Sequence, residues 1–597
     1  MLLSRINSPD DLKKLTIEEV EELVPEVRDF LIESLSKTGG HLGPNLGVVE
    51  LTIALHYVFN SPENMIIWDV SHQCYIHKIL TGRKEHMLTL RKNDGMPGFT
   101  AREESEHDLV DVSHGGTSLS IAMGLAMANR FKGRSALPIA VIGDGSLVEG
   151  LAAEALNHIG SETVPMLIVL NDNGRAIDAN VGALHNYLST LKNKDDETYF
   201  KSLGIDYHGP YDGHDVVGLI KTLRDNKDIQ SPTVIHIKTE KGRGLSYTKE
   251  SPVHLHHSFP FVIETGEAVQ TNPDYYWEKP RFPNIAVHAG KALVEMMDKD
   301  KNVVLITPAT RYATETYECF AKFPNRCIDV GMAEQHAVTL AAGLAAAGMK
   351  PVLCFQSTFF QRSFDSLVHD VCCNNLPVLF LLARSGLAGL DHTTHHSTLD
   401  ISYLRGVPNL KISYPTSHHD LGEIIKERIT SLDGPTVILF PYGNLGELEP
   451  QDEADFEYIN RDCEGQAEGT ILFLGNRLQT AIKLKKLLDS EGVKFCLKNV
   501  VEIKPLNEAL LKGVFENSGR VITLEENALQ GGFGSAVLEF ACDRGYKNDI
   551  MRVGLPDRLI EHGTRAHLYP KLSIDEQSVL GRMKQRWPEL FGSKDKS

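Results

Sequence analysis

The sequence predicts an α/β protein built on parallel β-sheets. Short and nearly continuous apolar runs recur along the chain, and they end in Gly, Asp or Asn. The segments between them carry apolar residues at helical spacing. This alternation is typical of strands buried on both faces of a parallel sheet and joined by crossover helices. At 597 residues, the chain is long enough for two to four such domains.

The amino-terminal part contains one complete β-α-β unit. Residues 16–37 have apolar side chains three and four apart and acids near the start, which predicts a helix that stops at the glycine pair 39–40. The runs LPIAVIGD (137–144) and VPMLIVLND (164–172) predict two buried strands. Residues 146–162 between them predict the crossover helix.

The same pattern repeats twice further along the chain. Predicted strands lie at 302–308, 350–355, 377–386 and 435–444, and then at 470–475, 493–500 and 520–527. The composition changes at a Pro- and aromatic-rich stretch (271–284) and at an acidic stretch (446–457). We therefore expect three α/β domains, at 1–275, 276–447 and 448–597.

Composition narrows the class of function. The formal net charge is −18, which argues against wholesale wrapping of nucleic acid or anionic lipid. No apolar run approaches the ~18 residues of a membrane-spanning helix, and the amino terminus lacks the apolar stretch of a signal peptide. The nine cysteines form no CxxC pair, so we expect reduced thiols in a cytoplasmic enzyme.

Polar residues follow the two predicted strands of the β-α-β unit. Gly143-Asp144-Gly145 ends the first strand, and Asn171-Asp172-Asn173 ends the second. Neighbouring parallel strands deliver their carboxyl ends to one edge, so Asp144 and Asn173 are expected to hold one ion together. Carboxylate, amide and carbonyl oxygens suit magnesium or calcium, and a following helix amino terminus favours a phosphate. The spacing predicts a metal–diphosphate site.

This motif resembles that of the transketolase superfamily of thiamine-diphosphate enzymes. Within it, the chain is similar to the 1-deoxy-D-xylulose-5-phosphate synthases over nearly its whole length. Ordered matches lie at 39–62, 66–83, 141–160, 180–188, 209–220, 241–245, 333–345, 356–371, 394–405 and 524–535. The resemblance implies a homodimer that needs magnesium and thiamine diphosphate and joins pyruvate to glyceraldehyde 3-phosphate with loss of carbon dioxide.

The resemblance also implies the architecture. It predicts three doubly wound domains of transketolase type, with parallel sheets in the two cofactor-binding domains and a mixed sheet in the third. The first domain would bind the diphosphate and the metal, the second the aminopyrimidine, and the third would serve mainly in assembly. In this family the cofactor lies between the first two domains of one chain.

Cofactor-binding residues follow from the matched motifs. The resemblance assigns Asp144, Asn173 and the carbonyl of Arg175 to magnesium. It assigns the diphosphate and thiazolium region to His72, Ser113, His114, Gly115, Gly145 and Ser146, with Asn173 also contacting the cofactor. Phe359 is expected to stack on the pyrimidine ring.

Glu334 matches the glutamate that activates the cofactor in this family. A carboxyl group that shares a proton with the pyrimidine ring nitrogen stabilises the imino tautomer, which acts as an internal base. The surrounding residues are small and apolar, so the carboxyl group should retain a proton. The alternative from the residue alone is that Glu334 caps the helix that starts there.

Proton transfer around the reacting carbon requires donors and acceptors near neutral pH. His41, His256 and His395 match family histidines with this role, and Asp391 would orient His395. His392 and His396 match no family position and stay unassigned. Because the chain has 25 histidines, only those embedded in motifs escape the simpler interpretation as packing or surface residues.

The sequence departs from the family at the acceptor phosphate. Family enzymes use two arginines and a tyrosine there, since guanidinium groups match phosphate geometry. Arg384 matches the first arginine, but Tyr442 stands where the second is expected and Gln356 stands at the tyrosine position. Arg362 or Lys241 are candidates to compensate. A lost charge-assisted contact costs about 2–3 kcal/mol.

Other departures lie closer to the cofactor. Leu245 and Ser71 replace a tyrosine and a glycine of the family, and the GHSS motif reads Ser113-His114-Gly115-Gly116. The loop between Ser189 and Tyr207 is shorter by some tens of residues.

Four hypotheses stay open on sequence alone. The chain is the synthase, or a paralogue that passes the same two-carbon unit to a different aldehyde, phosphorylated or unphosphorylated, as Tyr442 and Gln356 suggest. A transketolase or a 2-oxo acid dehydrogenase component would consume ketoses or need a lipoyl partner. A catalytically silent binding protein would have no chemical need for Glu334, Asp144 and Asn173.

Overall fold

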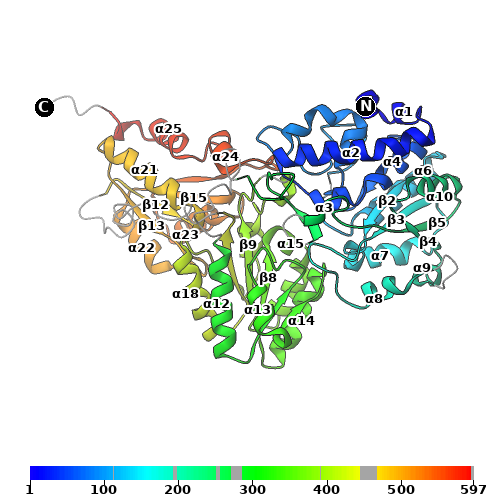
Figure 1. Cartoon of the computed structure of the whole chain (residues 1–597). Helices are drawn as coiled ribbons and strands as arrows, with labels where there is room; N and C mark the ends of the chain where they lie inside the picture. Colours follow the sequence, from blue (N-terminus) through cyan, green and yellow to red (C-terminus); the bar gives the residue numbers. More distant parts are fainter. Residues whose placement is uncertain are drawn as a thin grey trace. The chain divides into compact units, whose positions relative to one another are not determined.

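The computed structural model describes residues 1–111, 113–192, 198–249, 256–269, 285–389, 392–443 and 467–592. The chain divides into two compact units (Figure 1). The first comprises residues up to 274 together with 330–333 and His392, and the second holds the remaining described residues.

The first unit is built on a five-stranded parallel sheet in the order β1-β2-β3-β5-β4. Its strands are β1 (Ile66–Trp68), β2 (Ile139–Gly143), β3 (Met166–Asp172), β4 (Asp206–Asp212) and β5 (Pro232–Lys238). The two apolar runs predicted as strands are β2 and β3, and every residue of β3 is buried. Burial on both faces explains why these strands read as continuous apolar runs.

Helices cover both faces of this sheet. One apolar core includes residues of α2 (Ile17–Thr38), α4 (Val49–Val58) and α10 (Val216–Asp225), and the other includes residues of α6 (Ser118–Lys132) and α7 (Gly150–Ile159). The predicted amino-terminal helix is α2. Thr16 and Glu19 form a capping box at its start, and Gly39 ends it with a φ of 68°.

The second unit contains two sheets. The seven-stranded sheet has the order β14-β10-β11-β9-β8-β6-β7. Its strands are β6 (Val303–Thr307), β7 (Cys327–Asp329), β8 (Lys350–Gln356), β9 (Leu379–Ser385), β10 (Lys411–Ser413), β11 (Thr436–Pro441) and β14 (Glu502–Lys504). Helices α12 (Ala286–Lys299) and α18 (His418–Thr430) contribute to the core on one face.

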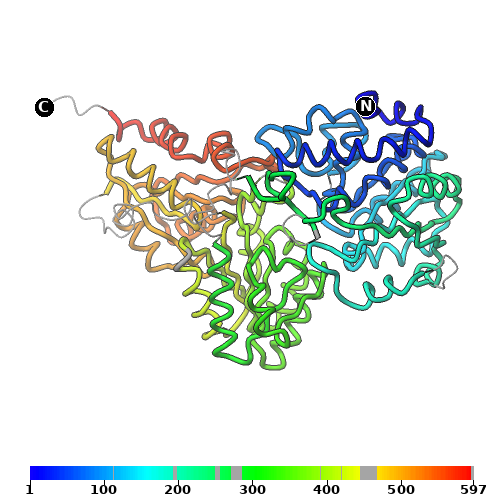
Figure 2. The backbone as a smooth tube through the Cα atoms, viewed as in Figure 1, coloured from blue at the N-terminus to red at the C-terminus, as the bar shows by residue number. Residues whose placement is uncertain are grey.

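The four-stranded sheet has the order β13-β12-β15-β16, and its described strands are parallel. They are β12 (Gly469–Phe473), β13 (Phe495–Asn499), β15 (Arg520–Ala528) and β16 (Asp549–Leu555), covered by α21 (Leu478–Ser490), α23 (Phe533–Asp543) and α25 (Glu576–Arg586). The antiparallel strand of this part of the chain, β14, pairs with β10 at the edge of the seven-stranded sheet. Figure 2 follows the course of the backbone from the amino to the carboxyl terminus.

The transketolase-type α/β class expected from the sequence is confirmed. The domain boundaries predicted at 275–276 and 447–448 lie outside the described residues and stay predictions. In the described part of the chain, no helix is both long and apolar enough to cross a membrane. The expectation of reduced thiols is wrong at Cys496, which is disulfide-bonded, because pairing depends on proximity in space rather than on spacing along the chain.

Candidate active site

The ends of β2 and β3 bring the two polar motifs together. Gly143 of β2 pairs with Asn171 of β3, and the Asp144 amide donates to the Asn171 carbonyl over 3.1 Å. Asp144 and Asn173 therefore follow neighbouring strand ends at one edge of the sheet, as the β-α-β pattern predicts.

Asp144 is a buried carboxylate of which only one oxygen, Oδ2, accepts hydrogen bonds from the described residues. Its Oδ2 atom accepts from the Gly174 amide and from Asn180 Nδ2, each over 2.8 Å. Its Oδ1 atom is buried and has no hydrogen-bond partner within the described part of the chain. Burial and the neighbouring Asp172 carboxylate raise the pKa of Asp144 to about 7. An oxygen in this position fits a divalent cation, which would stabilise the ionised form.

The loop after β3 is held in a compact turn. Asn173 Oδ1 accepts from the Arg175 amide over 3.0 Å, and the Asn180 amide donates to the Gly174 carbonyl over 3.0 Å. The side chain of Arg175 is exposed, which agrees with a role for its carbonyl alone. Among the described residues no three His, Cys, Asp or Glu side chains cluster as a metal site, and an Asp–Asn–carbonyl set would not form such a cluster.

Asp69 fixes the loop that contains the predicted diphosphate residues Ser113 and His114. Its Oδ1 atom accepts from the Gly116 amide over 2.9 Å and its Oδ2 atom from the Ser118 amide over 3.0 Å. Because Ser118 begins α6, Asp69 also satisfies an amide at that helix amino terminus. The sequence reasoning missed Asp69, although this residue lies in the matched stretch 66–83, immediately after β1.

Two glycines of the predicted site lie in close contact with neighbouring segments. A Cβ atom at Gly115 would lie 2.7 Å from Glu149 Oε1 and 3.2 Å from Ser146 Oγ, which are atoms at the ends of side chains. A Cβ atom at Gly145 would lie 2.9 Å from the Cβ and 3.1 Å from the Cα of Ala176. The loop at Gly145 therefore approaches the main chain of the loop after β3, which a larger residue would prevent.

Three of the predicted residues form a histidine cluster. The ring centroids of His41, His72 and His256 lie 5.3–5.5 Å from one another. The ring of Phe99 lies 5.3 Å from that of His41, and His41 Nδ1 lies 3.1 Å from the Tyr75 hydroxyl. Residues that are far apart in the sequence are thus gathered in one place, which only the resemblance predicted.

Lys241 joins the histidine cluster to the loop after β3. Its Nζ atom lies 3.1 Å from His256 Nδ1, and it also donates to the carbonyl of Ala176. Burial lowers the pKa of Lys241 to about 7. Burial, and then the charge of Lys241, hold the pKa of His256 well below its usual value. His256 is therefore neutral near pH 7.

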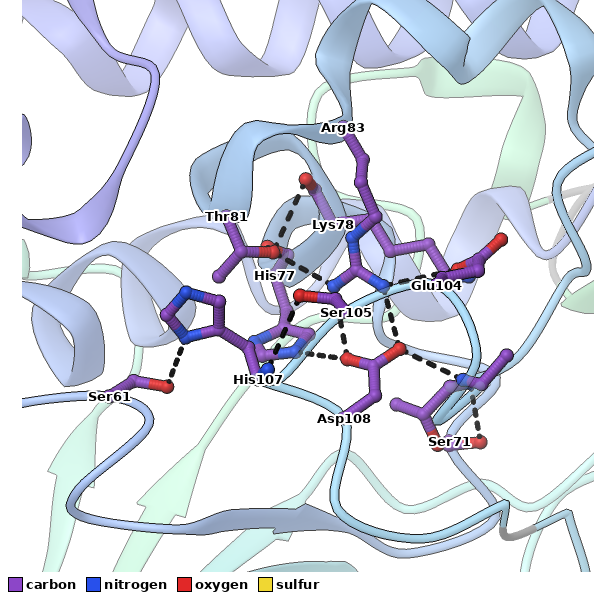
Figure 3. A network of polar contacts seen from close by, with 12 residues as sticks. Ser61, Ser71, His77, Lys78, Thr81, Arg83, Glu104, Ser105, His107 and Asp108 are labelled. Atoms are coloured by element: carbon purple, nitrogen blue, oxygen red, sulfur yellow. Dashed lines mark hydrogen bonds and ion pairs between the residues drawn. The ribbon is translucent and has the colours of Figure 1, made fainter.

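A buried charged network supports the segment that contains His72 (Figure 3). Asp108 accepts from His77 Nε2 over 2.8 Å and from both terminal nitrogens of Arg83 over 2.6 and 3.0 Å. The Ala101 amide also donates to Asp108, over 2.8 Å. Burial opposes ionisation, but these donors hold the pKa of Asp108 far below its usual value.

The network continues on both sides of Asp108. Lys78 and Arg83 pair with Glu104, and His77 Nδ1 lies 2.9 Å from Nε2 of the fully buried His56. The basic residues of the matched stretch 66–83 are thus structural, which the sequence reasoning did not recognise.

Asp172 is part of a second network that the sequence reasoning missed. Its Oδ2 atom lies 3.0 Å from His236 Nε2 and also accepts from Lys238. Burial opposes ionisation, but both donors hold the pKa of Asp172 below its usual value. Asp172 therefore remains charged next to Asp144, and its negative charge favours the binding of a cation there.

In the second unit, Glu334 is the first residue of α14 (Glu334–Ala346) and is buried. Its Oε2 atom has no hydrogen-bond partner within the described residues. Burial raises the pKa of Glu334 to about 7, and the charge of Arg362 only partly opposes this shift. The carboxyl group thus holds a proton more readily than an exposed glutamate does, as the apolar sequence around it predicts.

Phe359 and His395 lie together in the second unit. Phe359 is in α15 (Ser357–Phe360), and its ring centroid lies 6.0 Å from that of His395 in an edge-on arrangement. The Thr358 hydroxyl donates to the Thr394 carbonyl over 2.8 Å and joins their two segments. Asp391, predicted to orient His395, lies outside the described residues.

His396 has a structural role. Its Nδ1 atom accepts from the Ala388 amide over 3.0 Å, and its Nε2 atom donates to the Glu561 carbonyl over 3.0 Å. Burial lowers the pKa of His396 to about 4, so this histidine is neutral.

Three of the four predicted acceptor residues, Arg384, Gln356 and Tyr442, lie at the carboxyl ends of β9, β8 and β11, whereas the charge of Arg362 acts on Glu334. The guanidinium carbon of Arg384 lies 4.4 Å from the ring centroid of Tyr442 and 4.9 Å from that of Tyr312. The Tyr312 hydroxyl donates to Gln356 Oε1 over 2.8 Å. Tyr312 lies in a loop without a recognisable motif, and the sequence reasoning missed it.

Models of known protein families match most of the chain. Residues 3–199 and 190–239 match the family model described as 1-deoxy-D-xylulose-5-phosphate synthase. Residues 284–447 match the transketolase pyrimidine binding domain and 457–579 the transketolase C-terminal domain.

Full-length relatives carry the same name. The chain is 40% identical to 1-deoxy-D-xylulose-5-phosphate synthase of Caldanaerobacter subterraneus, over 99% of this chain and 100% of the relative. It is 41% identical to that of Geobacillus thermodenitrificans, over 98% and 99% of the two chains. Among solved structures, transketolase from Campylobacter jejuni is 15% identical over 96% of this chain and 100% of that one, with a TM-score of 0.44. From its similarity to full-length relatives, this chain belongs to the 1-deoxy-D-xylulose-5-phosphate synthase family.

Proposed function

We propose that the chain catalyses the thiamine-diphosphate-dependent condensation of pyruvate with D-glyceraldehyde 3-phosphate, giving 1-deoxy-D-xylulose 5-phosphate and carbon dioxide. Relatives with this name match it at about 40% identity from end to end. The structural observation that carries the proposal is the buried Asp144 carboxylate, with one oxygen unpartnered in the described residues, beside Asn173 at the strand ends.

The residues of the first unit fit a magnesium–diphosphate group. Asp144 Oδ1, Asn173 and the Arg175 carbonyl would hold Mg²⁺, a cation that prefers oxygen ligands. Gly145 lies in close contact with Ala176 of the loop after β3, and the backbone amides at Gly115 and Gly145 would bind the diphosphate. His72, Ser113, His114 and Ser146 would contribute polar contacts.

The residues of the second unit fit the aminopyrimidine. Glu334 would hold its proton against the ring nitrogen, and Phe359 would offer an aromatic face. When bound, thiamine diphosphate supplies a nucleophilic carbon that accepts the two-carbon unit of pyruvate. Glu334 is suited to this task because burial raises the pKa of its carboxyl group to about 7, so that it exchanges a proton near neutral pH.

Histidines would then act as the proton donors and acceptors of the condensation. His256 is neutral and lies beside Lys241, so it accepts a proton without first losing one. His41 lies between His256 and the Tyr75 hydroxyl, an arrangement that suits proton movement. His395, with Asp391 as its orienting partner, would serve the same chemistry from the second unit.

Arg384 would bind the phosphate of the acceptor, with Tyr442 and Gln356 completing that side of the site, while Arg362 would act on Glu334, whose pKa its charge lowers. We further propose a cytoplasmic homodimer, on the resemblance alone. The relatives named above disfavour transfer to a different, unphosphorylated aldehyde, but Tyr442 and Gln356 make the acceptor the decisive point to test.

A product assay tests the proposal. Pyruvate is supplied with either D-glyceraldehyde 3-phosphate or D-glyceraldehyde, with added Mg²⁺ and thiamine diphosphate. The expected result is 1-deoxy-D-xylulose 5-phosphate and a kcat/KM at least about a hundredfold higher for the phosphorylated aldehyde. Equal use of both aldehydes, or no product from either, would refute the proposed reaction.

A further inference from the structure

The backbone around Arg384 is irregular in a way that redirects its side chain. In the pairing of β9 with β11, Ala383 pairs with Phe440 and Ser385 pairs with Pro441, so Arg384 is left over as a bulge. Its φ is 67°, in the left-handed region that residues with a Cβ seldom adopt. Bulges and strained residues of this kind occur where a strand must aim a side chain into a site.

Within the described part of the chain, the guanidinium group of Arg384 has no fixed anionic partner. It forms no hydrogen bond or ion pair with the described residues, and its Nε atom is buried without an acceptor. The charge of Arg384 acts on Glu315, whose pKa is raised by burial and only partly lowered by this charge. A half-buried cation without a counter-ion is a ready site for an anionic ligand.

Two tyrosine rings hold this cation. The guanidinium carbon lies 4.4 Å from the Tyr442 ring centroid and 4.9 Å from the Tyr312 ring centroid, both within the range of cation–π attraction. Aromatic faces attract the cation but do not accept strong hydrogen bonds from its N–H groups. The N–H donors at the edge of the guanidinium plane therefore remain available to a ligand.

Tyr312 also supplies a tyrosine hydroxyl beside position 356, where the family tyrosine is absent. The family tyrosine expected at position 356 is a glutamine here. The Tyr312 hydroxyl lies 2.8 Å from Gln356 Oε1, and Gln356 pairs across the sheet with Ala383, the neighbour of Arg384. A tyrosine hydroxyl thus lies beside residue 356, but it comes from the loop after β6.

Buried contacts from the carboxyl-terminal part of the second unit fix both edges of this arrangement. Arg565 donates to the Tyr442 carbonyl over 2.6 Å and lies 3.3 Å from Glu526 Oε1. Glu526 Oε2 accepts from the Leu387 amide over 2.8 Å, three residues after Arg384. The main chain on both sides of the guanidinium is therefore held in place.

From these contacts we propose that Tyr312 is a specificity-determining residue. Together with Tyr442 it orients Arg384 so that a single arginine binds the phosphate of the acceptor, where the family otherwise uses two arginines and a tyrosine. The inference rests on the proposed function for the identity of the acceptor. The binding of a phosphate at Arg384 depends on the geometry alone.

The test compares Tyr312→Leu, which removes the ring, with Tyr312→Phe, which removes only the hydroxyl. In Tyr312→Leu the KM for D-glyceraldehyde 3-phosphate should rise about tenfold, and competitive inhibition by inorganic phosphate should weaken equally. The kcat and the KM for D-glyceraldehyde should stay within about twofold. The matched control is Tyr317→Leu, which removes an exposed ring beside Arg311.

Direct binding separates this proposal from the proposed function. Calorimetric titration of the full chain with inorganic phosphate should give a Kd about tenfold weaker in Tyr312→Leu, whether or not the wild type forms product. An unchanged Kd, or an equal loss of kcat/KM for both aldehydes, would overturn the role of Tyr312. If circular dichroism shows that Tyr312→Leu is unfolded, Tyr312→Phe decides: a Kd and KM weakened about threefold support the role, and wild-type values refute it.

Discussion

The Nε2 atom of His77 lies 2.8 Å from Oδ1 of Asp108, and both side chains are fully shielded from solvent. Asp108→Asn should therefore destabilise the protein by about 3–5 kcal/mol, because His77 and Arg83 would lose the charge that satisfies them in the interior. Denaturant unfolding followed by circular dichroism measures this loss. Asp365→Asn is the control, since Asp365 and His369 form an Asp–His pair on the surface. Similar stability of the two variants would contradict the role of the buried network.

The carboxyl group of Asp144 should make magnesium binding dependent on pH. Its pKa is raised to about 7, so a proton competes with the cation below that pH. Magnesium affinity, measured calorimetrically with thiamine diphosphate present, should fall about tenfold per pH unit below 7 and level off above it. Asp144→Asn should lose most of this affinity, while Asp225→Asn on a remote helix should retain it. Affinity that is independent of pH would argue against Asp144 as a ligand.

Glu334→Ala should abolish release of carbon dioxide from pyruvate while leaving binding of the cofactor measurable. Removal of a positioned acid–base group typically costs 10²–10⁴-fold in rate. The protonated form of Glu334 declines as the pH passes 7, so wild-type kcat should fall on the alkaline side. Carbon dioxide release and fluorescence titration of the cofactor measure the two properties separately. If Glu334→Ala still turned over pyruvate, Glu334 would not be the residue that activates the cofactor.

Asp400 should make stability depend on pH. It is fully buried, accepts from the hydroxyls of Ser357 and Ser385 over 2.6 and 2.8 Å, and burial raises its pKa to about 7. The folded protein therefore holds a proton that the unfolded chain releases near pH 4. This contribution is complete below pH 4 and is lost as the pH rises to 7, at up to about 1.4 kcal/mol per pH unit.

Asp400→Asn should remove that part of the pH dependence. The amide keeps the shape of the neutral carboxyl group but does not titrate. Unfolding free energies at pH 5, 6 and 7 should fall less steeply in this variant than in the wild type. Asp365→Asn again serves as the exposed control, and identical slopes in wild type and Asp400→Asn would show that Asp400 is ionised in the folded state.

His256→Asn should lower kcat by about 10²-fold or more with a small effect on cofactor affinity. The neutral ring lies 3.1 Å from Lys241 and packs on His41 and His72, so asparagine preserves the size of the polar group but not its proton chemistry. Steady-state kinetics and cofactor titration separate the two effects. His158→Asn, on the surface of α7, is the control, and a variant of His256 with normal kcat would exclude a proton-transfer role.

The fold was predictable because its strands are buried on both faces. Runs such as 137–144 and 164–172 are apolar throughout, and parallel pairing then placed Asp144 and Asn173 at one edge without further information. The bulge at Arg384 was not predictable, because it depends on the register between β9 and β11. Tyr312 was equally hidden, because it acts on a residue that is distant in sequence and stands in no recognisable motif. Lys241 lies in a matched stretch and was a candidate for the acceptor side, but its contact with His256 was not predicted.

The contacts of Arg565 with Tyr442 and Glu526 have a practical implication for redesign. Protein engineering to broaden the range of aldehydes accepted would ordinarily change residues that contact the substrate. Here the carbonyl of Tyr442 and the amide of Leu387 are tethered from behind by two side chains of the last third of the chain. Substitution of Arg565 or Glu526 would release the main chain at Tyr442 and Leu387, on both sides of Arg384. Positions 526 and 565 should therefore be varied from the first round of laboratory evolution.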